Sequence, residues 1–277
     1  MSAHAYTEDQ LVEQPAVQLF AALGWQTATA VEEVFGATGT LGRETPGEVV
    51  LLPRLRAALE KLNPALPPEA VTAAVDELTR DRSAMGLPAA NREVYRLLKD
   101  GIAVSVVDAQ APPSAQPSPK GRGSGGQRTV RVRVIDWENP VTNDFLLVSQ
   151  FSVTGALYTC RPDLVAFVNG LPLVVIELKK PGVPARAAFD ENLTSYKHPQ
   201  NGIPALFVFN ALLIASNGTD SRVGSLTADW ERFFEWKRIE REDEPRRVSL
   251  EVMLRGTGDP LLPRLLSGQV ELEAHAA

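Results

Sequence analysis

Residues 164–179 read LVAFVNGLPLVVIELK, and this stretch decides the fold. Two almost continuously apolar runs, 164–168 and 171–179, flank the dipeptide Asn169-Gly170. An Asn-Gly pair between two such runs predicts a β-hairpin. Strands that are apolar on both sides are typical of the centre of a sheet. We therefore expect this hairpin to be central and buried on both faces.

Charged side chains lie at the end of the predicted hairpin that is opposite its turn. Asp163 directly precedes the first strand, and Glu177 and Lys179 stand two apart on the second, hence on one face. Burying these charges is costly unless they pair or bind a cation. Two carboxylates and a backbone carbonyl, which we assign to Leu178, are hard oxygen ligands suited to Mg²⁺. With a lysine to orient water, this set favours a site that hydrolyses a phosphodiester.

The length of the hairpin loop tests this hypothesis. A regular two-residue loop pairs Asp163 with Ile176, which puts Asp163 and Glu177 on opposite faces. A three-residue loop ending at Leu171, with a glycine bulge, pairs the two carboxylates directly. A metal site therefore requires that loop, a bulge nearer the site, or an Asp163 outside the strand. The alternative is that Asp163 is a turn residue and that Glu177 and Lys179 form an ordinary ion pair.

The rest of the sequence predicts helices first and a group of strands afterwards, hence a mixed α/β sheet flanked by helices. A capping box at 7–10 begins a helix that Pro15 interrupts and Gly24 ends. Segment 109–127, rich in Pro, Ser and Gly, is expected to be a disordered loop. Further helices are expected over 51–62, 68–78, 94–100 and 189–196 and in the aromatic segment 230–236, and further strands over 102–108, 130–134, 145–153, 205–209 and 211–215.

Composition limits the possible functions. The chain has 277 residues, a net charge of −6 and one cysteine, Cys160, which excludes an internal disulfide and a cysteine-based zinc cluster. We find no run of 18 apolar residues and no secretory signal, so we expect a cytoplasmic protein without a membrane span. A protein that holds DNA by itself is usually basic. If DNA is the substrate, a larger complex or a local basic site must supply most of the binding.

The hairpin and its neighbours resemble a known family. RPDLVAFVNGLPLVVIELKKP (161–181) is similar to the PD-(D/E)xK nuclease signature as found in type I restriction enzyme R subunits. Further similar blocks follow in the family's order over most of residues 7–240: TEDQLVEQPAVQLFAALGW, LNPALPPEAV, GLPAANREVYRLLKDGI, IDWENPVTNDFLLVSQF and IPALFVFNALLIASNG. The resemblance implies a restriction-endonuclease-like sheet with an N-terminal helical block. It also implies an Mg²⁺-dependent DNA endonuclease domain over residues 1–240.

The resemblance also assigns roles to single residues. The family's metal-binding aspartate and glutamate match Asp163 and Glu177, and its lysine matches Lys179. The glutamate of its first helix matches Glu13, with Glu8 as the nearby alternative; an ordinary solvated helix charge is equally expected for Glu13.

A Gln and a Tyr that the family carries four residues apart match Asn192 and Tyr196. The asparagine is one methylene shorter, and core packing is the alternative for the tyrosine ring. Four basic side chains after the motif are candidates for the DNA backbone, with a solvated basic edge as the alternative for each: Lys180, Arg186, Lys197 and His198.

The family's R subunits continue into an ATP-driven motor. This sequence contains no GxxxxGK[ST] phosphate loop, so ATP is expected only for the full-length family; residues 241–277 resemble the lead-in to that motor and then an irregular tail, as in a truncated product or fragment. The implied partners are double-stranded DNA and the modification and specificity subunits. One alternative is a catalytically silent remnant that only binds those partners. A stand-alone nuclease fits less well, because the helical block at 49–100 resembles the R subunit.

Overall fold

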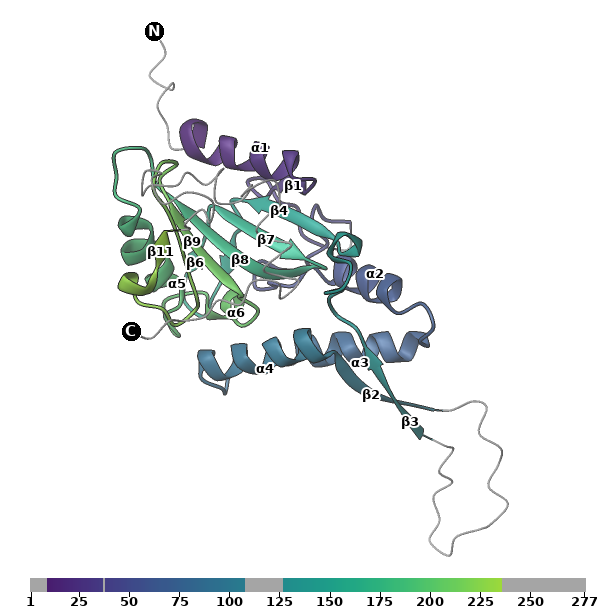
Figure 1. Cartoon of the computed structure of the whole chain (residues 1–277). Helices are drawn as coiled ribbons and strands as arrows, with labels where there is room; N and C mark the ends of the chain where they lie inside the picture. Colours follow the sequence, from purple (N-terminus) through teal and green to yellow (C-terminus); the bar gives the residue numbers. More distant parts are fainter. Residues whose placement is uncertain (1–8, 37, 108–126, 236–277) are drawn as a thin grey trace, which may run out of the picture.

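The computed structural model describes residues 9–36, 38–107 and 127–235 (Figure 1). Three features expected from the sequence lie outside them: the start of the capping box with Glu8, the tail beyond 240, and segment 109–127 apart from Gln127, which begins a strand. In the part of the chain that is described, no helix is long and apolar enough to cross a membrane.

A seven-stranded mixed sheet forms the centre of the molecule, in the order β1-β4-β7-β8-β9-β10-β11. β1 runs parallel to β4 and β8 runs parallel to β9, while the other neighbours are antiparallel. Every residue of β7 and β8 is buried, which confirms the central hairpin. The strands are β1 Gln26–Thr29, β4 Phe145–Ser149, β7 Leu164–Val168, β8 Leu171–Leu178, β9 Leu212–Ser216, β10 Ser221–Gly224 and β11 Phe234–Glu235.

Helices flank this sheet, as the sequence predicted. The π-helical turn η1 (Asp9–Glu13) and α1 (Gln14–Ala22) lie along β1 and β4, and η3 (Ala188–Leu193) with α5 (Thr194–Tyr196) contacts β8 and β9 (Figure 1). A helical block and a projecting hairpin lie toward the other end: α2 Leu52–Leu62, α3 Pro68–Thr79, α4 Leu87–Asp100, β2 Ile102–Val107 and β3 Gln127–Val132. A small hairpin, β5 Val153–Thr154 and β6 Thr159–Cys160, precedes β7.

The β7–β8 hairpin combines a two-residue turn with a bulge. Val168 pairs with Leu171, so only Asn169 and Gly170 form the turn, with φ of 51° and 77° as in a type I′ turn. Phe167 then pairs with Pro172 but Ala166 pairs with Val174, so Leu173 is the extra residue of a β-bulge. Beyond the bulge the register runs to Leu164 opposite Ile176. Asp163 lies directly before β7 and opposite Glu177, so two of the expected routes apply: a bulge nearer the site, and an Asp163 outside the strand.

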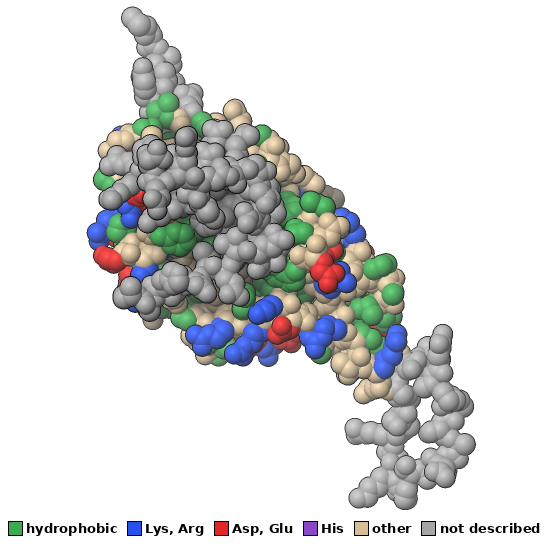
Figure 2. All heavy atoms as spheres, in the orientation of Figure 1, with side chains coloured by type: hydrophobic (Ala, Val, Ile, Leu, Met, Phe, Trp, Pro, Cys, Tyr) green, Lys and Arg blue, Asp and Glu red, His purple; other side chains and the backbone are tan. Residues whose placement is uncertain are grey.

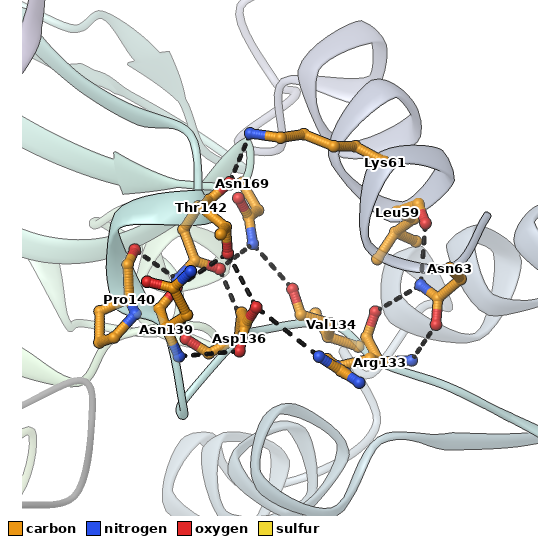
Figure 3. Close-up of polar contacts among 11 residues, drawn as sticks. Leu59, Lys61, Asn63, Arg133, Val134, Asp136, Asn139, Pro140, Thr142 and Asn169 are labelled. Atoms are coloured by element: carbon orange, nitrogen blue, oxygen red, sulfur yellow. Dashed lines mark hydrogen bonds and ion pairs between the residues drawn. The ribbon is translucent and has the colours of Figure 1, made fainter.

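Buried amides fix the turn to the rest of the molecule. Asn169 Nδ2 donates to Val134 O and to Asn143 Oδ1, both at 2.8 Å, and its Oδ1 accepts from the Asp144 amide at 2.7 Å (Figure 3). Asn63, at the end of α2, holds the same segment by exchanging hydrogen bonds with the backbone of Arg133. The hairpin therefore has a fixed end at the helical block and carries its charges at the opposite end.

Three expected elements differ in the structure. Segment 205–209 was expected to be a strand, but α6 (Pro204–Phe207) is a helical turn, with Pro204 preset for a helix start. The Nδ2 group of Asn91 holds the carbonyls that follow this turn. The aromatic segment is a 3-10 turn, η4 Trp230–Arg232, followed by β11, and not a helix. The strand expected over 145–153 stops at Ser149, because Gln150 adopts a left-handed φ of 56°.

Candidate active site

Asp163 and Glu177 meet at the end of the hairpin. The Leu178 amide donates to Asp163 Oδ2 at 2.8 Å, and the Asp163 amide donates to Glu177 Oε1 at 3.3 Å. The two carboxyl groups interact directly with each other. They share one face of the sheet because the bulge shifts the register by one residue. The structure thus brings together the two carboxylates that the sequence singled out.

Glu177 is buried to an extent that is costly for an anion. Only 1% of the residue is exposed. Burial, and secondarily the neighbouring charge of Asp163, raise the pKa of Glu177 well above its usual 4.5, while hydrogen bonds from Tyr196 and the Asp163 amide oppose the shift. A divalent cation would offset both causes of the shift by its positive charge. The residues present therefore fit such a cation.

Lys179 lies in a polar chain that returns to Glu177. Its Nζ donates to Asn192 Oδ1 at 2.8 Å and lies 3.3 Å from Glu191 Oε2. Asn192 Nδ2 donates to the Tyr196 hydroxyl at 3.2 Å, and this hydroxyl donates to the Glu177 carboxylate. Asn192, although one methylene shorter than the family's glutamine, thus still reaches Lys179. Tyr196 contributes its ring to the core and its hydroxyl to the site.

On the other side of Asp163, Gln150 links the pair to the first helical turn. Its Nε2 donates to Glu13 Oε2 at 2.7 Å and approaches Asp163 Oδ1 at 3.4 Å, and its amide donates to Asp163 O at 2.7 Å. Glu13 is only 6% exposed, so a solvated helix charge is excluded. Gln150 was not among the predicted site residues, since nothing in the sequence marks a glutamine that leaves a strand with a positive φ.

A groove opens beside this cluster. It has a volume of about 740 Å³ and lies between η1–α1 and the β1–β4 edge of the sheet. Glu13 and Gln150 line it, together with the hydroxyl-bearing Thr27, Thr29 and Ser149. The groove therefore opens onto the Glu13 and Gln150 side of the cluster.

The four basic candidates after the motif are mostly engaged within the protein. Arg186 pairs with Asp190 at 3.0 Å, and Lys197 donates to Leu226 O at 3.2 Å while lying over the ring of Phe189. Burial lowers the pKa of Lys197. His198 Nδ1 accepts from two backbone amides of its own turn, and Lys180 is exposed but also has a partner. Internal contacts thus account for at least three of the four.

The oxygen donors available to a cation are few. Across the described segments, no three His, Cys, Asp or Glu side chains lie close enough to form a metal site by themselves. The candidate ligands are therefore the carboxylates of Asp163 and Glu177, with the carbonyl of Leu178 where β8 ends. Hard oxygen donors of this kind suit Mg²⁺, which keeps part of its water shell in proteins.

Comparison with known proteins finds similar sequences over most of the chain. The family described as "Type I restriction enzyme R protein N terminus" matches residues 5–114 and 118–232. The HindI endonuclease subunit of Haemophilus influenzae is 33% identical over 255 residues, which are 90% of this chain and 22% of that protein. The MjaIXP endonuclease subunit of Methanocaldococcus jannaschii, described as putative, is 28% identical over 88% of this chain and 22% of that protein.

The fold and the matched residues together define a class, the nuclease-type α/β domains at the start of restriction subunits. This chain belongs to the family of type I restriction enzyme R protein N termini. It spans about a fifth of the length of the two relatives above.

Proposed function

We propose that this chain is the DNA-cleaving domain of a type I restriction enzyme and hydrolyses phosphodiester bonds with Mg²⁺. One observation carries the proposal: the bulge at Leu173 brings Asp163 and Glu177 together, in a position where a buried Glu177 anion beside a second carboxylate is unfavourable without a cation. An ordinary strand-end ion pair does not account for this, because Lys179 contacts Asn192 and Glu191 and not Glu177.

Each part of the cluster has a proposed role. Asp163, Glu177 and the carbonyl of Leu178 hold the cation, which supplies Lewis-acid polarisation of the phosphodiester and of water. Lys179 places an ammonium beside them, where it can orient the attacking water and offset charge on the phosphate. Asn192 fixes the direction of that ammonium through the 2.8 Å hydrogen bond to Nζ.

Tyr196 and Gln150 hold the carboxylates from two sides. The Tyr196 hydroxyl donates to Glu177, and Gln150 connects Asp163 with Glu13. These bonds restrict the carboxylate rotamers before substrate arrives, which is what a preorganised site requires.

We further propose that the chain acts in an assembly with DNA and other subunits. The substrate is double-stranded DNA, and the partners are the modification and specificity subunits, in the cytoplasm. ATP would act on the motor region of a full-length subunit. The recognition sequence is then read elsewhere in the complex, which agrees with the acidic net charge of −6.

The decisive experiment compares three alanine variants in two assays. Asp163→Ala and Glu177→Ala remove cation ligands, so both cleavage and Mg²⁺ affinity should fall. Lys179→Ala removes only a positive group, so cleavage should fall while Mg²⁺ affinity holds or rises slightly. Calorimetric titration measures the cation, and nicking of plasmid DNA, with partner subunits restored, measures the reaction.

Two results would refute the assignment. Unchanged Mg²⁺ affinity in both carboxylate variants would exclude the metal site, and wild-type cleavage by Lys179→Ala would exclude the role of the lysine. Normal Mg²⁺ binding without any cleavage by the intact chain in its complex would favour the silent remnant.

A further inference from the structure

A basic stripe lies on the solvent side of α4. Arg92, Arg96 and Lys99 follow one another at helical spacing and are exposed, while Ala90 and Val94 pack inward. We call these three cations the α4 stripe. Figure 2 shows blue side chains along the lower edge of the molecule, where α4 runs in Figure 1.

The stripe has little internal compensation: Asp100 lies beside it at the end of α4, but no ion pair joins the two in the described residues. Among the described residues, no hydrogen bond or ion pair engages the side chains of Arg92, Arg96 or Lys99. Glu93, the acidic residue that follows Arg92 on α4, forms ion pairs with Arg80 and, at 3.0 Å, with Arg82. Like charges three and four residues apart on a helix repel each other. An external anion would relieve this repulsion.

The stripe continues beyond the helix. Arg131 on β3 is exposed and reaches back to the carbonyls of Asp100 and Gly101, at 2.6 and 3.3 Å. This contact places its guanidinium next to Lys99, at the C-terminal end of α4. Tyr95, which is 54% exposed, lies beside the cations on the same helix. Cations in a row match the surfaces that bind a phosphate backbone.

The stripe is remote from the candidate active site. Asn91 fixes α4 to the carbonyls of Val208 and Asn210, directly before β9 begins. β9 runs parallel to β8, and Glu177 lies where β8 ends. Asn91 and the carboxylates are thus separated along the strand direction by the length of β9, about 15 Å. That distance corresponds to about four base pairs of duplex at about 3.4 Å each.

We propose that the α4 stripe binds the phosphate backbone of duplex DNA that flanks the cleavage position. The choice of DNA rests on the proposed function. The stripe supplies the local basic site that an acidic chain needs in order to hold DNA. Because the α4 stripe binds the flanking duplex and not the scissile phosphate, it raises the affinity for DNA and leaves the rate of the chemical step unchanged.

The test uses the 277-residue chain and a mixed-sequence DNA duplex in chelator, so that binding is measured without cleavage. The variant Arg92→Gln/Arg96→Gln/Lys99→Gln should bind about tenfold or more weakly, and the slope of log K against log salt should become shallower by nearly one per lost contact. The variant Arg92→Lys/Arg96→Lys keeps the charges and should bind like the wild type. Arg56→Gln/Lys61→Gln/Arg232→Gln makes the same change in net charge at other exposed cations and should have little effect.

Failure of this proposal is distinguishable from failure of the nuclease proposal. Asp163→Ala should retain stripe-dependent binding, since the stripe does not use the metal site. Equal affinity and equal salt slope in the triple α4 variant and the wild type would overturn the stripe proposal even if cleavage is confirmed. An equal loss of DNA affinity in the control Arg56→Gln/Lys61→Gln/Arg232→Gln would also overturn it. The effect would then depend on the net charge of the chain and not on the position of the cations.

Discussion

Glu177 is the residue whose charge this fold accommodates least well. Its folded pKa is raised above 4.5, so the protonated form is favoured in the native state. That contribution to stability is fully present below the unfolded pKa and is lost as pH rises through the folded pKa. Each unit of difference corresponds to about 1.4 kcal/mol.

The pH dependence of Glu177→Gln tests this. In chelator, the variant should gain stability relative to the wild type as pH rises above 4.5, with near equality below it. Urea unfolding at a series of pH values measures the difference. Addition of Mg²⁺ at neutral pH should restore the stability of the wild type and leave the stability of Glu177→Gln almost unchanged. Parallel pH profiles for the two proteins would contradict the account.

Gln150 combines a backbone role with a side-chain role. Asparagine tolerates a positive φ but is one methylene shorter, so Gln150→Asn should fold normally and lose the link between Glu13 and Asp163. Loss of a group that orients a ligand lowers metal affinity about tenfold or more. Gln150→Val should instead lower stability by about 1–3 kcal/mol, because a β-branched residue is strained at this φ.

Melting curves and Mg²⁺ titration separate the two roles of Gln150. Wild-type Mg²⁺ affinity in Gln150→Asn would show that the residue serves the backbone alone. The sequence does not reveal either role, because the left-handed conformation and the partners of Gln150 come from distant segments.

At the scale of elements, the β7–β8 turn requires glycine for two reasons. Gly170 has a φ of 77°, and a Cβ there would approach Leu51 O to 2.6 Å and Leu55 N to 2.7 Å. Gly182 has a similar φ of 91° but has nothing within 4 Å of such a Cβ. The two positions share the backbone conformation and differ only in the space around them.

Alanine at each glycine isolates the effect of packing. Gly182→Ala should cost about 1–2 kcal/mol, from the left-handed conformation alone. Gly170→Ala should cost about 1–3 kcal/mol more, since backbone atoms of α2 must move. Chemical unfolding of both variants measures the difference. Equal losses of unfolding free energy in the two variants would show that α2 can shift to accept the added Cβ without a loss of stability.

Elements with a strong local signal could be predicted from the sequence, and weak ones could not. The central hairpin was evident from its apolar runs and Asn-Gly turn, but the position of its bulge was not. β1 was missed because its four residues are mostly exposed and lack alternation. The apolar run before β9 was misread as a strand, because five apolar residues carry no period. Pro204 and the distant Asn91 decide in favour of a helical turn there.

At the scale of the whole molecule, a few buried amides join the helical block to the sheet. The Asn143 side chain accepts from the Asp136 amide and from Asn169 Nδ2, and donates to the carbonyls of Asp136 and Pro140, at 2.8–3.0 Å. This network lies at the turn end of the hairpin (Figure 3), whereas the carboxylates lie at the opposite end. Stability and chemistry should therefore be separable.

Asn143→Ala should lower the free energy of unfolding by about 2–4 kcal/mol, because it leaves buried donors and acceptors without partners. Well below the melting temperature, its Mg²⁺ affinity should equal that of the wild type. Asn139→Ala, at an exposed neighbouring position, should cost less than about 0.5 kcal/mol. A loss of Mg²⁺ affinity in Asn143→Ala at a temperature where the protein is folded would show that the two ends of the hairpin are coupled.

The bulge at Leu173 has an arithmetic consequence. With a two-residue turn, residues that face each other across a regular hairpin always differ by an odd number in the sequence. Asp163 and Glu177 differ by 14, an even number, so they can meet only through one unpaired residue or a loop of odd length. A related hairpin in which the two carboxylates differ by an odd number in the sequence needs neither an unpaired residue nor a loop of odd length. Parity of this spacing therefore indicates, without any structure, whether a homologous hairpin must contain an irregularity.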